Sequence, residues 1–150
     1  MRAVIQRVEK ASVVILENEI AKIEQGLLVL LGIEIEDTKE DALWLASKIA
    51  ALRIFSDENG VMNKSITESA GEVIVVSQFT LHAKTKKGNR PSYIKAARPE
   101  QAIALYQQFK EDLTLAIGRQ VQSGEFGAEM KVSLINDGPI TILIDTKNKE

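Results

Sequence analysis

The sequence contains no cysteine and only one histidine, His82. The lack of cysteine excludes disulfide bonds, thiol nucleophiles and thiolate metal ligands, and one histidine cannot build a zinc site from several imidazoles. Glycine-rich phosphate-binding loops of the GxGxxG or GxxxxGK type are also absent. The remaining chemistry belongs to hydroxyl, amide, carboxylate and basic groups, and no motif predicts a metal or another cofactor.

The chain also lacks long apolar runs. No stretch approaches the ~18 apolar residues of a membrane span, and residues 1–8 have no apolar segment of the kind found in signal peptides. Its 150 residues, 45% hydrophobic and 27% charged, have the balance of one globular domain over residues 1–150. We therefore expect a single-domain cytoplasmic protein with no membrane partner.

Acidic residues are missing from one stretch, although the net charge of the chain is −2. Residues 73–99 contain no Asp or Glu but six basic residues, which are Lys84, Lys86, Lys87, Arg90, Lys95 and Arg98. Such a block can neutralise nucleic-acid phosphates locally while the rest of the protein stays acidic. A lysine-rich loop that is merely solvated gives the same pattern, so charge alone leaves both interpretations open.

Apolar periodicity predicts several strands and two helices. Strands are expected at 2–8, 12–16, 19–23, 26–33, 73–76, 131–135 and 140–145. Thr38 and Asp41 resemble a capping box before a helix at 42–52, and a second helix runs from Pro99 to Gly118. Local hairpins with only two helices indicate an α+β fold with a mainly antiparallel, partly barrel-like sheet and both helices on one face.

Two polar segments are candidates for a site. One is Ser-Gln-Phe-Thr-Leu at 77–81, which follows an apolar strand, and the other is Asn-Asp-Gly-Pro-Ile-Thr at 136–141. Without further information, the first fits the end of an amphipathic strand and the second fits a turn. A Gly-Pro step can also adopt a cis peptide bond, which can direct backbone carbonyls at a ligand.

His82 offers a possible base for a nucleophile such as Ser77, Ser92 or a threonine. A lone histidine beside a lysine-rich loop is more often a surface residue or a phosphate contact. None of the spacings between Asp and Glu residues suggests a carboxylate pair or a metal cluster.

Four segments together resemble the D-aminoacyl-tRNA deacylase family. They are Met-Arg-Ala-Val-Ile-Gln-Arg-Val at 1–8, Ser-Gln-Phe-Thr-Leu at 77–81, Gly-Asn-Arg-Pro-Ser-Tyr at 88–93 and Asn-Asp-Gly-Pro-Ile-Thr at 136–141. The resemblance extends from Met1 to about Asp145. It implies an enzyme that hydrolyses the ester bond of D-aminoacyl-tRNA and so proofreads translation.

The resemblance also implies a homodimer in which a cis Gly138-Pro139 step enters the pocket of the partner subunit. A rigid loop against the substrate Cα admits a D side chain and excludes an L side chain by collision. Glycyl-tRNA should be accepted too, because glycine has no side chain to exclude. Arg7 matches the family arginine that supports the Gly-Pro step, a role suited to its planar, five-donor guanidinium.

The family's pocket motif corresponds to Ser77, Gln78, Phe79 and Thr80, which would receive the terminal adenosine and the aminoacyl group. Backbone donors near Phe79 would polarise the ester carbonyl while the ribose 2′-hydroxyl assists attack by water. Thr80 as a nucleophile is the competing mechanism, and it would need His82 as its base. Met130 is either a pocket residue or an ordinary buried methionine.

The basic residues gain a role in this context. Because their loop follows the pocket motif, Lys84, Lys86, Lys87 and Arg90 are candidates to bind the phosphates of the tRNA acceptor stem. Two other functions compete with D-aminoacyl-tRNA hydrolysis. One is a catalytically silent tRNA-binding module, and the other is a deacylase of different chirality that acts on L-aminoacyl-tRNA, although the pocket and Gly-Pro motifs differ in such relatives.

Overall fold

Strand β1 (Arg2–Ile15) organises the main sheet because it pairs with three other strands. The computed structural model describes residues 1–150. The other strands are β2 (Asn18–Ile23), β3 (Gly26–Gly32), β4 (Phe55–Ser56), β5 (Met62–Lys64), β6 (Glu72–Ser77), β7 (Gln122–Ser123) and β8 (Lys131–Asp145). The helices are α1 (Lys39–Ala51), α2 (Ile66–Ser69), α3 (Pro99–Ile117) and the 3-10 helix η1 (Phe79–His82).

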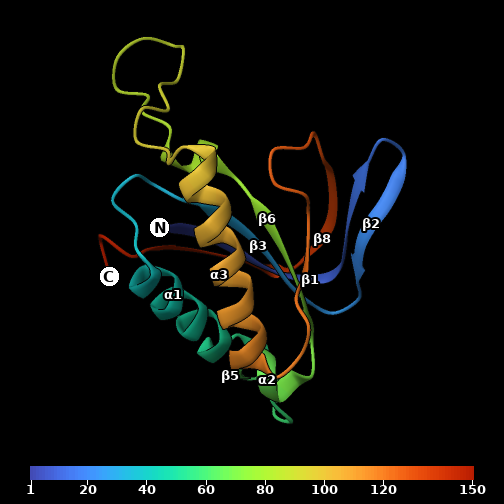
Figure 1. The fold of residues 1–150 in the computed structure, drawn as a ribbon. Helices are drawn as coiled ribbons and strands as arrows, with labels where there is room; N and C mark the ends of the chain where they lie inside the picture. Colours follow the sequence, from blue (N-terminus) through green and yellow to red (C-terminus); the bar gives the residue numbers. More distant parts are fainter.

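The six-stranded sheet is mixed. β1 runs antiparallel to β2, β3 and β8, whereas β3 and β6 are parallel, as are β6 and β7. The strand order is β2-β1-β3-β6-β7, with β8 on the other edge of β1. Figure 1 shows α1 and α3 side by side across one face of this curved sheet. The predicted α+β fold with a mainly antiparallel, partly barrel-like sheet is confirmed.

Both faces of the sheet are buried at its centre. Leu27, Val29 and Leu31 of β3 pack in the larger core beneath α1 and α3, while Leu28 belongs to a second core on the opposite face. The second core is enclosed by β1, β2, β3 and β6, with partly buried side chains of β8 packed against it. The unbroken apolar run at 26–33 thus reflects a central strand, as predicted.

Two pairs of predicted strands are single strands in the structure. The segments at 2–8 and 12–16 join into β1, because the polar pair Glu9 and Lys10 lies exposed where the β1–β8 register shifts. The segments at 131–135 and 140–145 likewise join into β8. Asn136 pairs with Val8 and Thr141 with Gln6, so residues 137–140 form a bulge opposite Arg7.

Sequence periodicity missed one small region between α1 and β6. Here β4 and β5 form a separate two-stranded sheet, and α2 follows them. The missed helix had a recognisable signal, since Ser65 and Glu68 form a capping box with reciprocal side-chain-to-backbone bonds. This region brings the carbonyl of Ile54 close to Arg7.

The predicted end signals of the two long helices are present, although α1 begins at Lys39, three residues before the predicted 42. The Thr38 N–H donates to the Asp41 carboxylate at 2.9 Å at the start of α1. Pro99 occupies the first turn of α3, and Gly118 ends it at φ +70°, a left-handed conformation that favours glycine. No helix in the structure is long and apolar enough to span a membrane.

Candidate functional site

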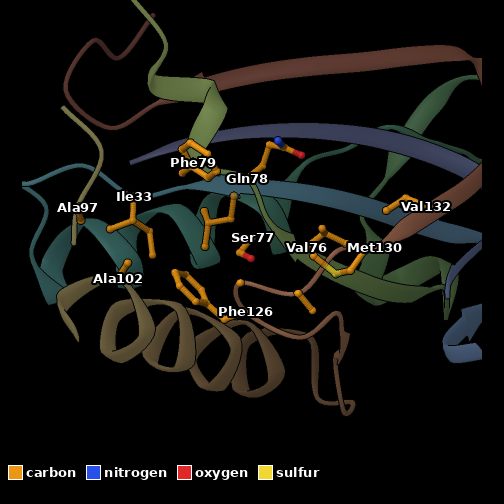
Figure 2. Close-up of a pocket in the computed structure, with 13 residues that line it drawn as sticks. Ile33, Val76, Ser77, Gln78, Phe79, Ala97, Ala102, Phe126, Met130 and Val132 are labelled. Atoms are coloured by element: carbon orange, nitrogen blue, oxygen red, sulfur yellow. The ribbon is translucent and has the colours of Figure 1, made fainter. Parts of the chain in front are cut away.

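A cavity of about 310 Å³ lies where β6 ends, between the sheet and the start of α3. Its walls are mainly apolar, and they include Leu31, Ile33, Val76, Ala97, Ala102, Phe126, Met130 and Val132. Figure 2 shows Phe79 above this space and Phe126 below it, with Ser77 between them. An apolar cavity beside a few polar groups has the character of a small-molecule site.

The turn after β6 places the predicted pocket residues. The Gln78 N–H donates to the Leu31 carbonyl at 2.7 Å, which extends the parallel pairing of β6 with β3 by one residue. The chain then turns into η1, so 77–81 is a strand end followed by a helical turn rather than a continuous strand. Ser77, Gln78 and Phe79 line the cavity, while Thr80 faces a neighbouring groove.

The first two backbone amides of η1 are candidates to bind a ligand beside the cavity. The amides of Phe79 and Thr80 open η1, where no preceding helical turn can accept their hydrogen bonds. Neither amide takes part in the surrounding turn and loop hydrogen bonds. Phe79 is 56% exposed, so this turn is accessible to an incoming ligand. Paired N–H groups of this kind can bind an oxyanion.

Thr80 and His82 do not form a nucleophile–base pair in this arrangement. The Thr80 hydroxyl accepts a hydrogen bond from the Gln78 side-chain amide. The His82 side chain is buried, and both of its ring nitrogens lack hydrogen-bond partners. His82 is the last residue of η1, and its side chain packs near Gly32. Its Cδ2 atom lies 3.1 Å from where a Cβ of residue 32 would lie. It is therefore a core residue rather than the surface or phosphate-binding residue that its sequence position suggested.

Gly138 and Pro139 lie away from the cavity of their own chain. Both are exposed, neither lines the cavity, and the peptide bond between them is cis, in line with the family resemblance. Asn136 anchors the bulge because its side-chain amide donates to the carbonyls of Arg7, at 3.0 Å, and Ile140, at 2.9 Å. The rigid Gly-Pro tip thus projects outward from the β1–β8 ladder.

Arg7 supports this bulge from below. Its Nη1 donates to the Ile54 carbonyl at 2.6 Å, and its Nε lies 3.1 Å from Oδ2 of Asp137 in an ion pair that falls short of hydrogen-bond geometry. A Cβ on Gly138 would lie 3.4 Å from the guanidinium, so the two groups are neighbours. The link to the Gly-Pro step runs through Asp137 and packing, because no guanidinium hydrogen bond reaches Gly138 or Pro139.

The basic loop stands beside η1. Figure 1 shows it projecting beyond the sheet near the N-terminal end of α3. Lys84 and Ser92 close the loop with two backbone hydrogen bonds, of 2.8 and 3.0 Å. All four predicted tRNA-binding side chains are exposed in it, namely Lys84, Lys86, Lys87 and Arg90. Nothing in the structure pairs their charges with a carboxylate.

Tyr106 fastens α3 to the strand that leads into the site. Its hydroxyl donates to the Val75 carbonyl at 2.9 Å, and burial raises the pKa of Tyr106 to about 12. Its ring also contacts the ring of Phe126, with centroids 5.9 Å apart. Tyr106 therefore remains a neutral hydrogen-bond donor that fixes one wall of the cavity.

Sequence reasoning missed part of the cavity wall. Phe126, Gly127 and Ala128 turn into it from the loop before β8, and Ala97 and Ala102 line it around the start of α3. Gly127 has φ +77°, a conformation that favours glycine, so the glycine in the sequence is a signal for a turn at this position. Met130 lines the cavity beside them, as one of the two interpretations of this residue held. No group of three or more His, Asp or Glu side chains converges on a possible metal position.

Comparisons with known proteins identify the family of the chain. The family model described as D-Tyr-tRNA(Tyr) deacylase matches residues 4–145. A D-aminoacyl-tRNA deacylase of Bacteroides fragilis (strain YCH46) is 63% identical over 150 residues, which covers all of both chains.

Two solved structures share the fold of this chain. One described as a c-Myc DNA unwinding element binding protein superposes with a TM-score of 0.92 at 41% identity, covering 97% of this chain and 98% of that one. Another, of a probable eukaryotic D-amino acid tRNA deacylase, has a TM-score of 0.81 at 17% identity, covering 95% and 97%, and supports the fold alone. With the family model spanning nearly the whole sequence, the chain belongs to the D-Tyr-tRNA(Tyr) deacylase family.

Proposed function

We propose that this protein hydrolyses the ester bond of D-aminoacyl-tRNA, releasing the D-amino acid and intact tRNA. The observation that carries the proposal is the pair of free amides at Phe79 and Thr80 beside an apolar cavity. The names and identities of the relatives support the same substrate. Its place of action would be the cytoplasm, where aminoacylated tRNA is used in translation.

The reaction requires a nucleophile and stabilisation of negative charge. Water attacks the ester carbonyl carbon, and the oxygen that becomes negative accepts hydrogen bonds from the amides of Phe79 and Thr80. The bond from this carbon to the ribose oxygen then breaks, and that oxygen takes a proton. The 2′-hydroxyl of the same ribose lies next to the scissile ester, so it can assist the attack without a protein base.

The cavity fits the end of the tRNA. Its apolar walls, including Phe126 and Met130, suit the flat terminal adenine, while Ser77 and Gln78 supply polar groups where the ribose and the ester would lie. In this arrangement Thr80 has no covalent role. Its hydroxyl is paired with Gln78, and no base lies within reach to activate it.

Chirality would be read by a second subunit. Gly138 and Pro139 are exposed and face away from their own cavity, so a homodimer that inserts them into the partner's cavity explains both features. There the backbone would lie against the substrate Cα and block an L side chain, while glycyl esters would pass. Arg7, through Asp137, would keep the tip rigid.

The basic loop would hold the acceptor stem. Lys84, Lys86, Lys87 and Arg90 are exposed beside η1, where the phosphates of a docked tRNA would arrive. Contacts of this kind set affinity and orientation, and they weaken as salt increases.

The central experiment compares hydrolysis of D-Tyr-tRNA and L-Tyr-tRNA by the purified protein, with an enzyme-free control for spontaneous ester loss. We expect rapid release of D-tyrosine alone. If tRNA binds in a salt-dependent way and neither ester is cleaved, the protein is a silent tRNA-binding module. Cleavage of both esters would contradict the proposed role of Gly138 and Pro139 in excluding L-amino acids. Cleavage of the L-ester alone would mean that the selectivity is the opposite of the one proposed.

A mixed-subunit experiment tests insertion between subunits. Gly138→Ala should impair only the Gly-Pro tip that a subunit inserts into its partner. Ala128→Trp should block only the cavity of the subunit that carries the substitution. Random assortment of the two inactive variants gives half heterodimers, each with one intact composite site, so activity should return to about a quarter of the wild-type rate. No recovery in mixtures whose heterodimers are detected by mass spectrometry would mean that each site belongs to one chain.

A further inference from the structure

Tyr93 and Phe79 form an aromatic contact that the proposed reaction has not yet used. Their ring centroids are 5.0 Å apart and their planes are inclined by 76°, an edge-to-face arrangement. Both residues are substantially exposed, at 37% for Tyr93 and 56% for Phe79. Exposed aromatic pairs contribute little to a core, so a contact directly over the catalytic backbone calls for another explanation.

The segment that carries Tyr93 is anchored firmly on both sides. Before it, the two backbone hydrogen bonds between Lys84 and Ser92 close the basic loop. After it, the Ile35 N–H donates to the Lys95 carbonyl at 3.0 Å, and the Ala97 N–H donates to the Ile33 carbonyl at 2.9 Å. Residues 92–97 thus form a strap that is bonded to the end of β3 and leads directly from the basic loop.

Phe79 is held less firmly on its own. The Phe79 amide makes none of the turn and loop bonds around it, and its side chain leaves the core for the cavity mouth. The ring of Tyr93 is its aromatic neighbour. Without this contact the residue would lose a restraint on its position, and the direction of its backbone N–H group would be less well defined.

We propose that Tyr93 is a positioning residue that holds Phe79, and with it the carbonyl-binding amides, in the productive orientation. Through the strap, the same contact links the basic loop to the reaction centre, so that tRNA phosphates and the ester carbonyl are fixed by one rigid unit. Only the ring of Tyr93 is required, because the contact with Phe79 is made between the two rings. This inference rests on the proposed ester hydrolysis.

The test compares two substrates, D-Tyr-tRNA and the D-tyrosyl ester of adenosine, which lacks all acceptor-stem phosphates. We expect Tyr93→Ala to lower kcat about five- to tenfold on both, with little change in KM, because it misaligns groups used in the transition state. Tyr93→Phe should retain wild-type kcat. Ile94→Ala, a change to the 70% exposed next residue, is the matched control and should also behave as wild type.

A double variant, Lys86→Ala with Lys87→Ala, separates positioning from RNA binding. It should raise KM for D-Tyr-tRNA and leave the adenosine ester unaffected. If Tyr93→Ala gives that same pattern, Tyr93 is only an RNA contact and the inference is wrong. Unchanged kinetics of Tyr93→Ala would also overturn it. By contrast, a wild-type protein that cleaves neither ester would overturn the proposed hydrolysis itself.

The midpoint of thermal unfolding distinguishes a loss of positioning from a loss of the fold. Because Tyr93 is partly exposed, Tyr93→Ala should unfold at nearly the wild-type temperature. If that variant proves unstable, recovery of kcat in Tyr93→Phe but not in Tyr93→Leu would still support an aromatic positioning role. Equal kcat in the Phe and Leu variants would contradict it.

Discussion

The two halves of the proposed site are built in opposite ways. The η1 half continues a central strand, and its residues are held by β3 on one side and by the strap on the other. The Gly138-Pro139 half is a bulge on an outer strand, exposed and held by Asn136 and Arg7. One half is positioned by the core of its own chain, whereas the other is rigid but directed outward. Mutations in the two halves should therefore differ in their effects on unfolding free energy and on hydrolysis.

The largest effect is expected from Gly32→Ala, in the buried half. A Cβ there would lie 2.9 Å from the Gln78 carbonyl oxygen and 3.0 Å from the Leu81 Cβ, so η1 would have to move. Overpacking of this kind costs about 2–3 kcal/mol of unfolding free energy. Urea unfolding should show this loss together with a large drop in D-Tyr-tRNA hydrolysis. Full activity would mean that η1 tolerates displacement.

Gly138→Ala should produce nearly the reverse, a loss of activity with little loss of stability. Gly138 has φ +125°, and an added Cβ would lie 2.8 Å from Cγ1 of Ile140. Because the tip is exposed, it can relax into solvent, but a displaced selector should lower kcat/KM about 100-fold. Thr80→Ala is the comparison and should cost much less. If Thr80→Ala is inactive and Gly138→Ala is not, the nucleophile mechanism replaces the one proposed.

A gain in stability is expected from His82→Phe, at the last residue of η1. His82 is 2% exposed and neither ring nitrogen has a partner, so burial of these polar atoms is uncompensated. Replacement by an apolar ring should stabilise the fold by about 1 kcal/mol, measured by urea unfolding. Hydrolysis should continue at the wild-type rate. An inactive but well-folded His82→Phe protein would instead assign a chemical role to this histidine.

The smallest effect concerns Lys147, which ties the end of β8 to α1. Although partial burial alone would raise the pKa of Asp41, hydrogen bonds from Lys147 and Thr38 lower that pKa well below its usual range. Because the folded pKa lies below the ordinary value of 3.8, this stabilisation is present above that pH and is lost as pH falls below it.

Lys147→Gln should therefore reduce unfolding free energy by less than about 1 kcal/mol near neutral pH, since the ion pair is partly exposed. Its unfolding curve should also depend less steeply on pH below about pH 4. Activity should be unaffected, because this anchor is remote from the Gly-Pro tip. A loss of hydrolysis would mean that the outer half depends on the whole length of β8.

Much of the fold could be predicted because it follows local patterns. The apolar run of β3 and the stripe of α3 correspond to buried surfaces, and Thr38, Pro99 and Gly118 mark helix ends in the ordinary way. The continuity of β1 and β8 could not be predicted. It depends on pairing between residues more than 100 positions apart, which carries Glu9 and Lys10 through an exposed irregularity.

The site was predictable only in part for a similar reason. The family resemblance implied a pocket at Ser77 to Thr80 and a Gly138-Pro139 step that leaves its own chain, but the residues alone indicated only a strand end and a turn. The interpretation of His82 as a surface residue was wrong, because the polarity of a side chain does not reveal the packing around it. Ala97, Ala102 and Ala128 carry no chemical signal at all, since they contribute space rather than a functional group.

The pairing of β1 with β8 also bears on how the chain is made. Residues 2–14 find their partners at 131–145, so this ladder cannot close until residues 131–145 have left the ribosome. β2, β3 and β6 can assemble with β1 earlier, and they bring η1 with them. Arg7 must wait for Asp137, which is synthesised 130 residues later, before the Gly-Pro bulge takes shape. The proposed selector is thus completed after the cavity half has its framework.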